Sequence, residues 1–451
     1  MRSALFALLL ASGSAWSGTD LIAAWQAARN HDPVYQGDRA SASAGSLKQR
    51  QAQALWLPNI GLQGGAGYAK VKNEITGATF SAPALGSMSD ANFTTDVKNG
   101  RETHWGVSVT QPLFNAERSA NSAQLTQQSR LAELKFTEND QQLFLRVAQR
   151  HFDVLIAEEA LATQKAQKSA VQESLDMARE NFRIGKSAST DMHEAQASFD
   201  AIVAQEFALQ SDLDLKRAAF SDLTGLSANG LARLDVDPSL DALQPGALQT
   251  LIDQGVVESP LVKMSDVGKE ISALEIGKHR AATAASVDLV AQYGQQNIDG
   301  NGNSSSIYGR SGSIGVQVTI PIYTGGMRSA KYEEAIALAE KARQDTEVSR
   351  QIISQRIRLA YLSLRSGLER SKALKQGLIS AQSKLEATRI GREIGARTTS
   401  DVLNAQQAYF AVMNDLIRTR YQILFSDLDL AAASGAMNEQ RLNRVNLFLM
   451  Q

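Results

Sequence analysis

The sequence predicts a mainly α-helical protein with a small β portion, built as a tandem repeat of helix, strand, strand, long helix and returning helix. Only 8 of its 451 residues are proline, which favours long uninterrupted helices. Residues 115–182 contain neither proline nor glycine, which is enough for a helix of roughly 100 Å at about 1.5 Å per residue. The two halves of the chain also superpose on one another in sequence, so each half is predicted to be one copy of a structural unit.

The charge balance and the residue types exclude several functional classes. The chain has 46 basic and 47 acidic side chains, and its net charge of −1 leaves no global field to attract nucleic acid. It has no cysteine, which removes disulfides, thiolate metal sites and thiol catalysis. The five histidines are scattered without metal-ligand spacing, and no pattern of a nucleophile with its base is present. We therefore expect no catalytic residues, no metal, no cofactor and no nucleic-acid partner.

The first residues, 1–17, are predicted to be a signal peptide. Arg2 precedes a short apolar run from Ala4 to Ala11, and small residues follow up to Ser17. The run is too short for a transmembrane helix, which needs about 20 apolar residues. No later segment approaches that length, so the exported protein is expected to be either soluble or inserted as a β-barrel.

Corresponding residues identify the boundaries of the two copies. Pro33 superposes on Pro260, and Gly185 superposes on Gly395. The first copy is longer than the second between its two apolar runs, and such length variation is typical of a surface loop. The predicted segments are a first structural repeat at 18–225, a linker at 226–246, a second structural repeat at 247–435 and a C-terminal tail at 436–451.

Each copy contains two predicted β-strands, in which larger apolar residues alternate with polar residues or glycine. The first pair is placed at 59–69 and 103–114, and the second pair at 286–294 and 313–323. Period-2 runs of about ten residues with one apolar face are typical of lipid-facing strands of a membrane barrel. A half-buried hairpin of a soluble protein has the same pattern, so the alternation alone does not decide between them.

Each strand pair is followed by a predicted long helix and a returning helix, joined by a turn that contains glycine. In the returning helix of the second copy, Val402, Tyr409 and Leu416 are each seven residues apart. A second series of positions with the same spacing begins three residues later, at Ala405, and many of these positions hold small residues. This pattern indicates a close-packed coiled coil. The helices are placed at 115–183 and 190–224 in the first copy and at 327–394 and 400–434 in the second.

Four strands constrain the assembly if they enter a membrane. Known membrane barrels begin at about eight strands, so one chain would supply only part of a shared barrel. Identical chains around a cyclic axis meet this requirement. A strand barrel at one end and a helical cylinder at the other describe a duct.

Four motifs carry a resemblance to a known family. They are Gln111-Pro112-Leu113-Phe114, Ile-Pro-Ile-Tyr-Thr-Gly-Gly at 320–326, Phe-Arg-Ile-Gly at 182–185 followed by Thr190-Asp191, and Ile-Gly-Ala-Arg-Thr-Thr-Ser-Asp-Val-Leu-Asn-Ala at 394–405. Together with the signal peptide and the doubled order of elements, they make the chain similar to TolC-family outer-membrane channels over essentially the whole mature sequence.

The resemblance implies a fold, a location and partners. The implied fold is a trimeric, twelve-stranded β-barrel continuous with a coiled-coil α-helical tunnel. The implied location is the outer membrane of a Gram-negative cell, with a large periplasmic portion. The implied partners are two further copies of the chain in a homotrimer, outer-membrane lipid, a periplasmic membrane fusion (adaptor) protein and an inner-membrane ABC or RND transporter.

The resemblance also implies a gate where the helices turn at the periplasmic end. In the family, an Arg and an aromatic residue on one helix pair reach a Thr-Asp pair on the other. Carried over to this sequence, Arg397 would meet Thr190 and Asp191. The aromatic position is occupied by Arg392, which departs from the family pattern and would form a charge pair with Asp191.

An acidic ring that lines the constriction is implied at Asp401. The second ring position is Asn404 rather than Asp, so a trimer would have three carboxylates rather than six, and we expect weaker cation affinity than in a channel with two rings. The alternative role is structural, because Thr190 and Ser400 stand at N-cap-like positions of the returning helices.

The predicted function is a passive export duct across the outer membrane and the periplasm. We favour the outer-membrane component of a type I protein secretion system, because the absence of an N-terminal Cys argues against the lipid-anchored efflux branch. The first alternative is the outer-membrane component of a multidrug or small-molecule efflux pump. An alternative from another class is a secreted coiled-coil structural protein, in which the strand pairs would be soluble hairpins.

Overall fold

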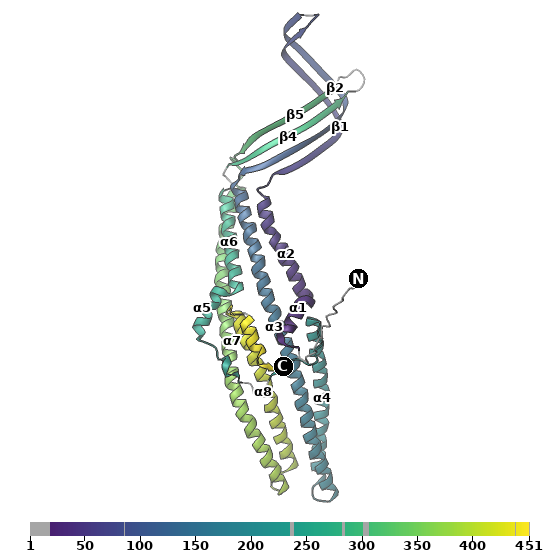
Figure 1. The fold of residues 1–451 in the computed structure, drawn as a ribbon, viewed down its shortest axis with the longest axis vertical. Helices are drawn as coiled ribbons and strands as arrows, with labels where there is room; N and C mark the ends of the chain where they lie inside the picture. The colour runs from purple at the N-terminus through teal and green to yellow at the C-terminus, as the bar shows by residue number, and fades with distance from the viewer. Residues whose placement is uncertain are drawn as a thin grey trace, which may run out of the picture. The chain divides into compact units, whose positions relative to one another are not determined.

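The computed structural model describes residues 19–84, 86–234, 239–281, 285–300, 306–437 and 439–450. The predicted signal peptide, 1–17, lies outside these residues. The chain divides into two compact units, each of which collects segments from both halves of the sequence (Figure 1). The helical unit comprises the described parts of Met1–Gly45, Leu131–Asp266 and Gln344–Gln451, and the sheet unit comprises those of Ser46–Arg130 and Val267–Arg343.

The same order of elements occurs twice along the chain. The first half contains α1 (Leu21–His31), α2 (Pro33–Ala54), β1 (Asn59–Ala82), β2 (Gly86–Phe114), α3 (Ala116–Arg183) and α4 (Ser189–Thr224). The second half contains α5 (Leu248–Glu258), α6 (Pro260–Ala281), β4 (Ser286–Asp299), β5 (Ile307–Thr319), α7 (Met327–Glu393) and α8 (Thr399–Ala433). The long helices α3 and α7 have 68 and 67 residues, and the predicted mainly helical class with a small β portion is confirmed.

Proline and a buried carboxylate determine where α2 begins. Pro33 occupies the first helical position, where its missing N–H leaves no acceptor unsatisfied. The Asp32 carboxylate accepts a hydrogen bond from the backbone N–H of Val34 at 3.1 Å and from Arg146 at 2.8 Å. The corner between α1 and α2 is thereby joined to α3.

The core of the helical unit is formed by apolar side chains from both copies. The ring centroids of Phe152 on α3 and Tyr421 on α8 lie 5.8 Å apart, so the two copies pack directly against each other. Burial raises the pKa of Tyr421 to about 12. The largest fully buried side chains of this core include Phe144, Phe152, Phe220, Leu155, Ile357, Leu364, Ile423 and Leu424.

One imidazole is enclosed in this core. His151 has no exposed surface, and its ring centroid lies 6.0 Å from those of Phe152 and Phe220. Its Nε2 is 3.3 Å from the carbonyl oxygen of Ala232, while Nδ1 has no hydrogen-bond partner among the described residues. Burial disfavours the charged ring and lowers the pKa of His151 to about 4.

The segments predicted as linker and tail contain short elements of secondary structure. Within 226–246 lie β3 (Arg233–Leu234) and the 3-10 helix η1 (Leu240–Leu243), and within 436–451 lie α9 (Glu439–Asn446) and β6 (Leu449–Met450). β3 and β6 form a small antiparallel sheet. We name β3, β6 and α9 together the clasp. Elements of two to eight residues are too short to show a hydrophobic period in the sequence.

Two polar contacts hold the clasp to the rest of the helical unit. The guanidinium of Arg441 on α9 donates to the carboxylate of Asp427 on α8, which is fully buried. Burial raises the pKa of Asp427, and the nearby charge of Arg441 opposes that rise. Asn446 donates to the carboxylate of Asp20 at 3.0 Å and accepts from the backbone N–H of Leu21 at 3.2 Å.

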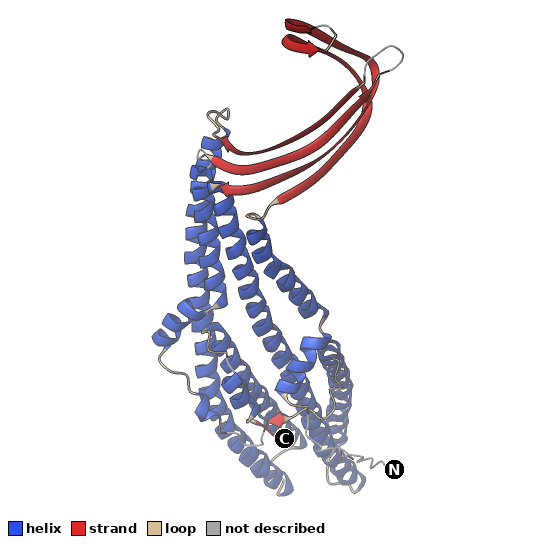
Figure 2. Cartoon of the chain, turned by 45° about the horizontal axis from the view of Figure 1, so that its top comes forward, coloured by secondary structure: helices blue, strands red, loops and turns tan. Residues whose placement is uncertain are grey.

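The sheet unit holds a curved antiparallel sheet with the strand order β1-β2-β4-β5 (Figure 2). Leu62 pairs with Val107, Val107 pairs with Tyr293, and Tyr293 pairs with Gly312, so one row of paired residues crosses all four strands. Within the described chain, β1 and β5 are each paired along one edge only.

The strands of the first copy are longer than the sequence predicts. β1 has 24 residues and β2 has 29, whereas the second-copy strands β4 and β5 have 14 and 13. The extra residues of the first copy, which were expected to form a surface loop, instead continue the two strands as a ribbon. The alternation of Val71, Asn73 and Ile75 with charged neighbours extends beyond residue 69 and accounts for this continuation. In the second copy β5 ends at Thr319 rather than 323, since Pro321 has no N–H for the ladder.

The two faces of the sheet have different chemistry. Because side chains alternate between faces, residues in one row share a face. The apolar face is exposed in the single chain, and Leu62 retains 78% of its accessible surface. This apolar face carries Ile60, Leu62, Trp105, Val107, Tyr293, Ile314 and Val316, and the opposite polar face carries Gly61, Gln63, Glu102, His104, Ser108, Gln292, Gln296 and Ser311.

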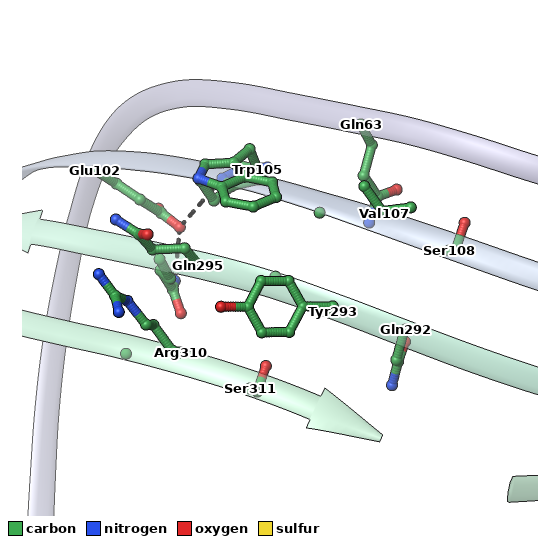
Figure 3. Close-up of a pocket in the computed structure, with 15 residues that line it drawn as sticks. Gln63, Glu102, Trp105, Val107, Ser108, Gln292, Tyr293, Gln295, Arg310 and Ser311 are labelled. Atoms are coloured by element: carbon green, nitrogen blue, oxygen red, sulfur yellow. Dashed lines mark hydrogen bonds and ion pairs between the residues drawn. The ribbon is translucent and has the colours of Figure 1, made fainter. Parts of the chain in front are cut away.

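A hollow of about 560 Å³ lies at the middle of the sheet (Figure 3). Beside it, the rings of Trp105 and Tyr293 have centroids 5.9 Å apart. The Glu102 carboxylate accepts from the Gln296 amide at 2.8 Å and lies 3.6 Å from Nδ1 of His104. These contacts fix side chains on β2 and β4 across their shared ladder.

None of the helices among the described residues combines the length and the apolar composition that crossing a lipid bilayer requires.

Candidate functional site at the tips of the helical hairpins

Two equivalent turns join the long helices to the returning helices. At the end of α3, Gly185 has a φ of +72°, and at the end of α7, Gly395 has a φ of +78°. The following N–H donates back into the helix in both turns, from Lys186 to Asn181 at 2.8 Å and from Ala396 to Gly391 at 2.7 Å. This is the Schellman arrangement, in which glycine accepts the left-handed conformation at low cost.

The start of α8 is fixed by reciprocal capping. The hydroxyl of Thr398 accepts from the backbone N–H of Asp401 at 3.1 Å, and the Asp401 carboxylate accepts from the backbone N–H of Thr398 at 2.9 Å. The hydrogen bond from the Thr398 N–H is the main reason why the pKa of Asp401 is lowered. The carboxylate is therefore charged at neutral pH.

The capping residues differ from the alternative drawn from the sequence. The N-cap of α8 is Thr398 rather than Ser400, and that of α4 is Ala188 rather than Thr190. Ala188 has no side chain that can accept a hydrogen bond, and Thr190 is an exposed residue of the first turn. The two returning helices therefore begin with different chemistry despite their similar turns.

Three of the six predicted residues meet at one hollow. A cavity of about 440 Å³ between α7 and α8 is lined by Arg397, Asp401 and Asn404 together with Lys384 and Thr388. The backbone N–H of Arg397 donates to the Gly391 carbonyl at 3.1 Å, and a Cβ on Gly391 would lie only 2.8 Å from the Arg397 Cγ. The absence of a side chain at Gly391 therefore leaves room for the side chain of Arg397. The hollow combines two cations with one carboxylate.

Asp191 is reached from the other hairpin by a residue that the sequence did not single out. The hydroxyl of Thr399 donates to the Asp191 carboxylate at 3.4 Å, and Thr399 is only 2% exposed. This hydrogen bond joins the start of α8 to the start of α4. Thr399 follows the N-cap directly, and no sequence pattern distinguishes it from its threonine neighbour.

Arg392 has a different partner from the one expected. Its Nη1 donates to the Met177 sulfur of α3 at 3.0 Å, rather than forming the expected charge pair with Asp191. A thioether is a weak acceptor, so this contact is weaker than an ion pair. The role of Arg392 in a gate stays a prediction.

A buried amide makes a further link between the hairpins. The Gln406 amide donates to the Ser174 hydroxyl at 3.2 Å and to the Ala170 carbonyl at 3.3 Å, and Gln406 is 1% exposed. Leu403, one turn earlier on α8, packs in the same cluster as Leu175. A glutamine beside a heptad stripe is the one signal in the sequence that could have indicated this contact.

The chemistry available at the tips is that of reversible polar contacts. In the described ranges, no group of three or more His, Cys, Asp or Glu side chains is placed to hold a metal ion. Hydrogen bonds and one charged hollow connect helices that are otherwise packed by apolar side chains. Such contacts can hold two helical hairpins together and release them without any covalent step.

Comparison with known proteins identifies the family. Residues 25–226 and 251–436 match the outer membrane efflux protein family. The chain is 26% identical to the outer membrane protein TolC of Vibrio cholerae, over 96% of this chain and 94% of the relative. It is 25% identical to the alkaline protease secretion protein AprF of Pseudomonas aeruginosa, over 94% of this chain and 86% of the relative.

The fold agrees with a solved structure of the same kind. A crystal structure of CusC, described in terms of folding and transmembrane channel formation, superposes with a TM-score of 0.76 and 18% identity, covering 93% of each chain. The family and the fold are those of channel proteins of the outer membrane rather than of enzymes. The chain belongs to the TolC-type outer membrane efflux protein family.

Proposed function

We propose that three copies of this chain form an export duct across the outer membrane and the periplasm. The sheet carries the proposal, because it has four strands, two unpaired edges and one exposed apolar face. Hydrocarbon cannot satisfy the N–H and C=O groups of an open edge. The edge of β1 in one copy therefore pairs with the edge of β5 in the next. Three copies close a twelve-stranded barrel with the apolar face toward lipid and the polar face toward the lumen.

Exposed apolar residues on the helices support contacts between copies. Phe207 and Leu215 on α4, and Leu359 on α7, each retain more than half of their accessible surface. Monomeric proteins rarely leave many large apolar side chains in water on one set of helices. In a trimer these side chains pack between neighbouring hairpins, which builds the wall of a helical tunnel.

The cargo we propose is an unfolded protein that passes through a type I secretion system. A relative named for alkaline protease secretion aligns with nearly the whole chain, which supports this assignment. Efflux of small molecules is the second candidate, because the family description is that of efflux proteins. An inner-membrane ABC transporter would supply energy in the first case and an RND transporter in the second, each through a periplasmic adaptor.

The hairpin tips are proposed to form the gate. Thr399, Gln406 and Arg392 join the two hairpins of one copy, so that the hairpins move together. Arg397 is held between Gly391 and the hollow that contains Asp401, where it can reach Thr190 or Asp191 of a neighbouring copy. Asp401 supplies one ring of three carboxylates at the constriction, and Asn404 supplies an uncharged ring.

The first experiment measures the native mass of the protein after detergent extraction from the outer membrane. A trimer is expected. A monomer or dimer that needs no detergent would overturn the duct and favour the secreted coiled-coil alternative. With a trimer in hand, a deletion strain separates the two cargoes. Loss of a secreted protein from the medium supports type I secretion, and increased sensitivity to small toxic molecules with normal secretion supports efflux.

The gate is tested by single-channel conductance in planar bilayers. Arg397→Ala is expected to raise conductance, because the tip loses the side chain that links neighbouring copies. Arg389→Ala is the matched control, since Arg389 is exposed near the end of α7, close in sequence to Arg397, and is not part of the hollow. Equal conductance of the wild-type, Arg397→Ala and Arg389→Ala channels would remove Arg397 from the gate.

A further inference from the structure

The long strands of the first copy continue past the four-stranded sheet as a two-stranded ribbon. β4 ends at Asp299 and β5 begins at Ile307, whereas β1 and β2 remain paired from Val71↔Val97 to Ala82↔Gly86. We name this part, 71–97, the ribbon. A two-stranded hairpin alone is marginally stable in water, so the ribbon requires a further contact.

The ribbon is bent away from the line of the sheet (Figure 1). The pairing shifts between Ala69 and Val71, and again on either side of Ala78. Gly77, Asp90 and Asn99 have positive φ values of 75°, 71° and 53°. Bulges with such residues increase the local twist and bend a strand pair.

The direction of the bend is set by a contact at its base. Val97 has no exposed surface, and Ile298 on β4 is 2% exposed. A Cβ on Gly100 would lie 2.6 Å from the Val97 Cγ1 and 2.8 Å from the Ile298 Cγ2, so both side chains cover Gly100. Ile298 pairs with Glu102, which belongs to the polar face. The side of the ribbon that carries Val97 therefore faces toward the polar face of the sheet.

That side of the ribbon carries its large apolar side chains, beside the Asn73–Thr95 pair. Phe93 is four residues from Val97 along β2 and therefore lies on the same face. Phe93 pairs with Ile75, and Phe80 pairs with Met88. The ring centroids of Phe80 and Phe93 are 5.8 Å apart, which places all four side chains on one side. They remain between 38% and 55% exposed. We name Ile75, Phe80, Met88 and Phe93 the apolar stripe.

The other side of the ribbon is charged. Lys72 pairs with Asp96, and Glu74 pairs with Thr94 and forms an ion pair with Lys72. Lys98 lies 3.6 Å from Asp96. The ribbon is thus amphipathic, with charges toward solvent and apolar side chains toward the space over the polar face.

We propose that the apolar stripe is covered by the same stripe of the other two copies, so that three ribbons form a lid over the outer mouth of the duct. This rests on the proposed trimer, in which the polar face surrounds the lumen. A ribbon that bends toward the polar face bends toward the axis, and the neighbours it meets there are the ribbons of the other copies. Their association removes the apolar stripes from water. Cargo leaves by separating the ribbons.

The test uses disulfide cross-linking between copies. The chain contains no cysteine, so one introduced thiol can bond only to another copy. Met88→Cys places the thiol on the apolar stripe, and Ser87→Cys places it on the neighbouring position of the opposite side. A disulfide requires Cα atoms within about 7 Å. Oxidation of purified trimers is expected to give a cross-linked dimer with Met88→Cys and none with Ser87→Cys.

Conductance and native mass complete the test. Oxidised Met88→Cys trimers are expected to lose conductance, and a thiol reductant is expected to restore it. Absence of the cross-link in a protein that is still a trimer by native mass would overturn the lid and leave the duct intact. Equal cross-linking of both variants would also overturn it, because the ribbons would then be free to meet by either side. A protein that is not a trimer would instead overturn the proposed function.

Discussion

The two helical hairpins have nearly the same lengths but use polar groups differently. α3 and α4 have 68 and 36 residues, and α7 and α8 have 67 and 35. The first copy buries a neutral imidazole at His151 and begins α4 at Ala188 without a side-chain cap. The second copy buries the carboxylate of Asp427, which pairs with the half-buried Arg441 of α9, and begins α8 with a capping box. The two copies therefore share the lengths of their helices, while their buried polar groups and helix caps differ.

The largest expected effect comes from breaking the ion pair of the second copy. Arg441→Ala should lower the free energy of unfolding by about 3 kcal/mol, because it leaves the carboxyl group of Asp427 buried without its partner. Thermal denaturation of the extracted protein measures the change. Replacement of both partners by apolar residues, Asp427→Leu with Arg441→Met, should recover most of the loss. If the single and double variants are equally destabilised, packing of α9 rather than the charge pair explains the effect.

Acid should act on the first copy through His151. The folded pKa is about 4, below the ordinary value of 6.5, so the unfolded state binds the proton more readily. The contribution of the neutral ring is complete above about pH 6.5 and is lost as the pH falls toward 4, by up to about 3 kcal/mol. Urea denaturation at several pH values in this range measures how the free energy of unfolding changes with pH. His151→Leu should reduce this pH dependence, and an unchanged pH dependence in that variant would assign the acid sensitivity to other groups.

Removal of the cap should weaken the start of α8. Thr398→Ala takes away the hydroxyl that accepts from the Asp401 N–H, and loss of an N-cap costs about 1 kcal/mol. Faster amide hydrogen exchange in the first turn of α8 is the expected signature. The Asp401 carboxylate should make the same turn acid-sensitive, because its lowered pKa means that this stabilisation is present at neutral pH and is lost on protonation. Exchange that is unaffected by the substitution would show that Thr399 and tertiary packing hold the turn.

The smallest effect is a gain in the first copy. Ala188→Ser supplies the missing cap of α4 and should add a few tenths to about 1 kcal/mol of stability. Slower exchange in the first turn of α4 would be measured by the same method. If both hairpins then exchange at similar rates, the cap accounts for the difference between them.

The helices were predictable because their signals are local. Absence of Pro and Gly over 115–182 and heptad spacing around Leu416 indicate long packed helices without any knowledge of partners. The ribbon was missed because strands with Lys72, Glu74 and Asp96 resemble a polar loop until their pairing is known. The clasp was missed because its elements are short.

The candidate site was predictable only in part. The turns, Arg397 and Asp401 follow from the glycine pattern and from the family resemblance. Met177 and Thr399 contact Arg392 and Asp191 over 200 positions away in sequence, and no local pattern encodes such a pairing. The partners of a side chain at a helix–helix contact depend on the register of two helices, which small differences in packing determine.

The contacts of Asn446 have a consequence for the order of folding. They join Asp20 and Leu21 to a residue more than 400 positions later. The first turn of α1 therefore reaches its final set of hydrogen bonds only after α9 has docked. Without α9, the backbone N–H of Leu21 loses this acceptor and the Asp20 carboxylate loses this donor.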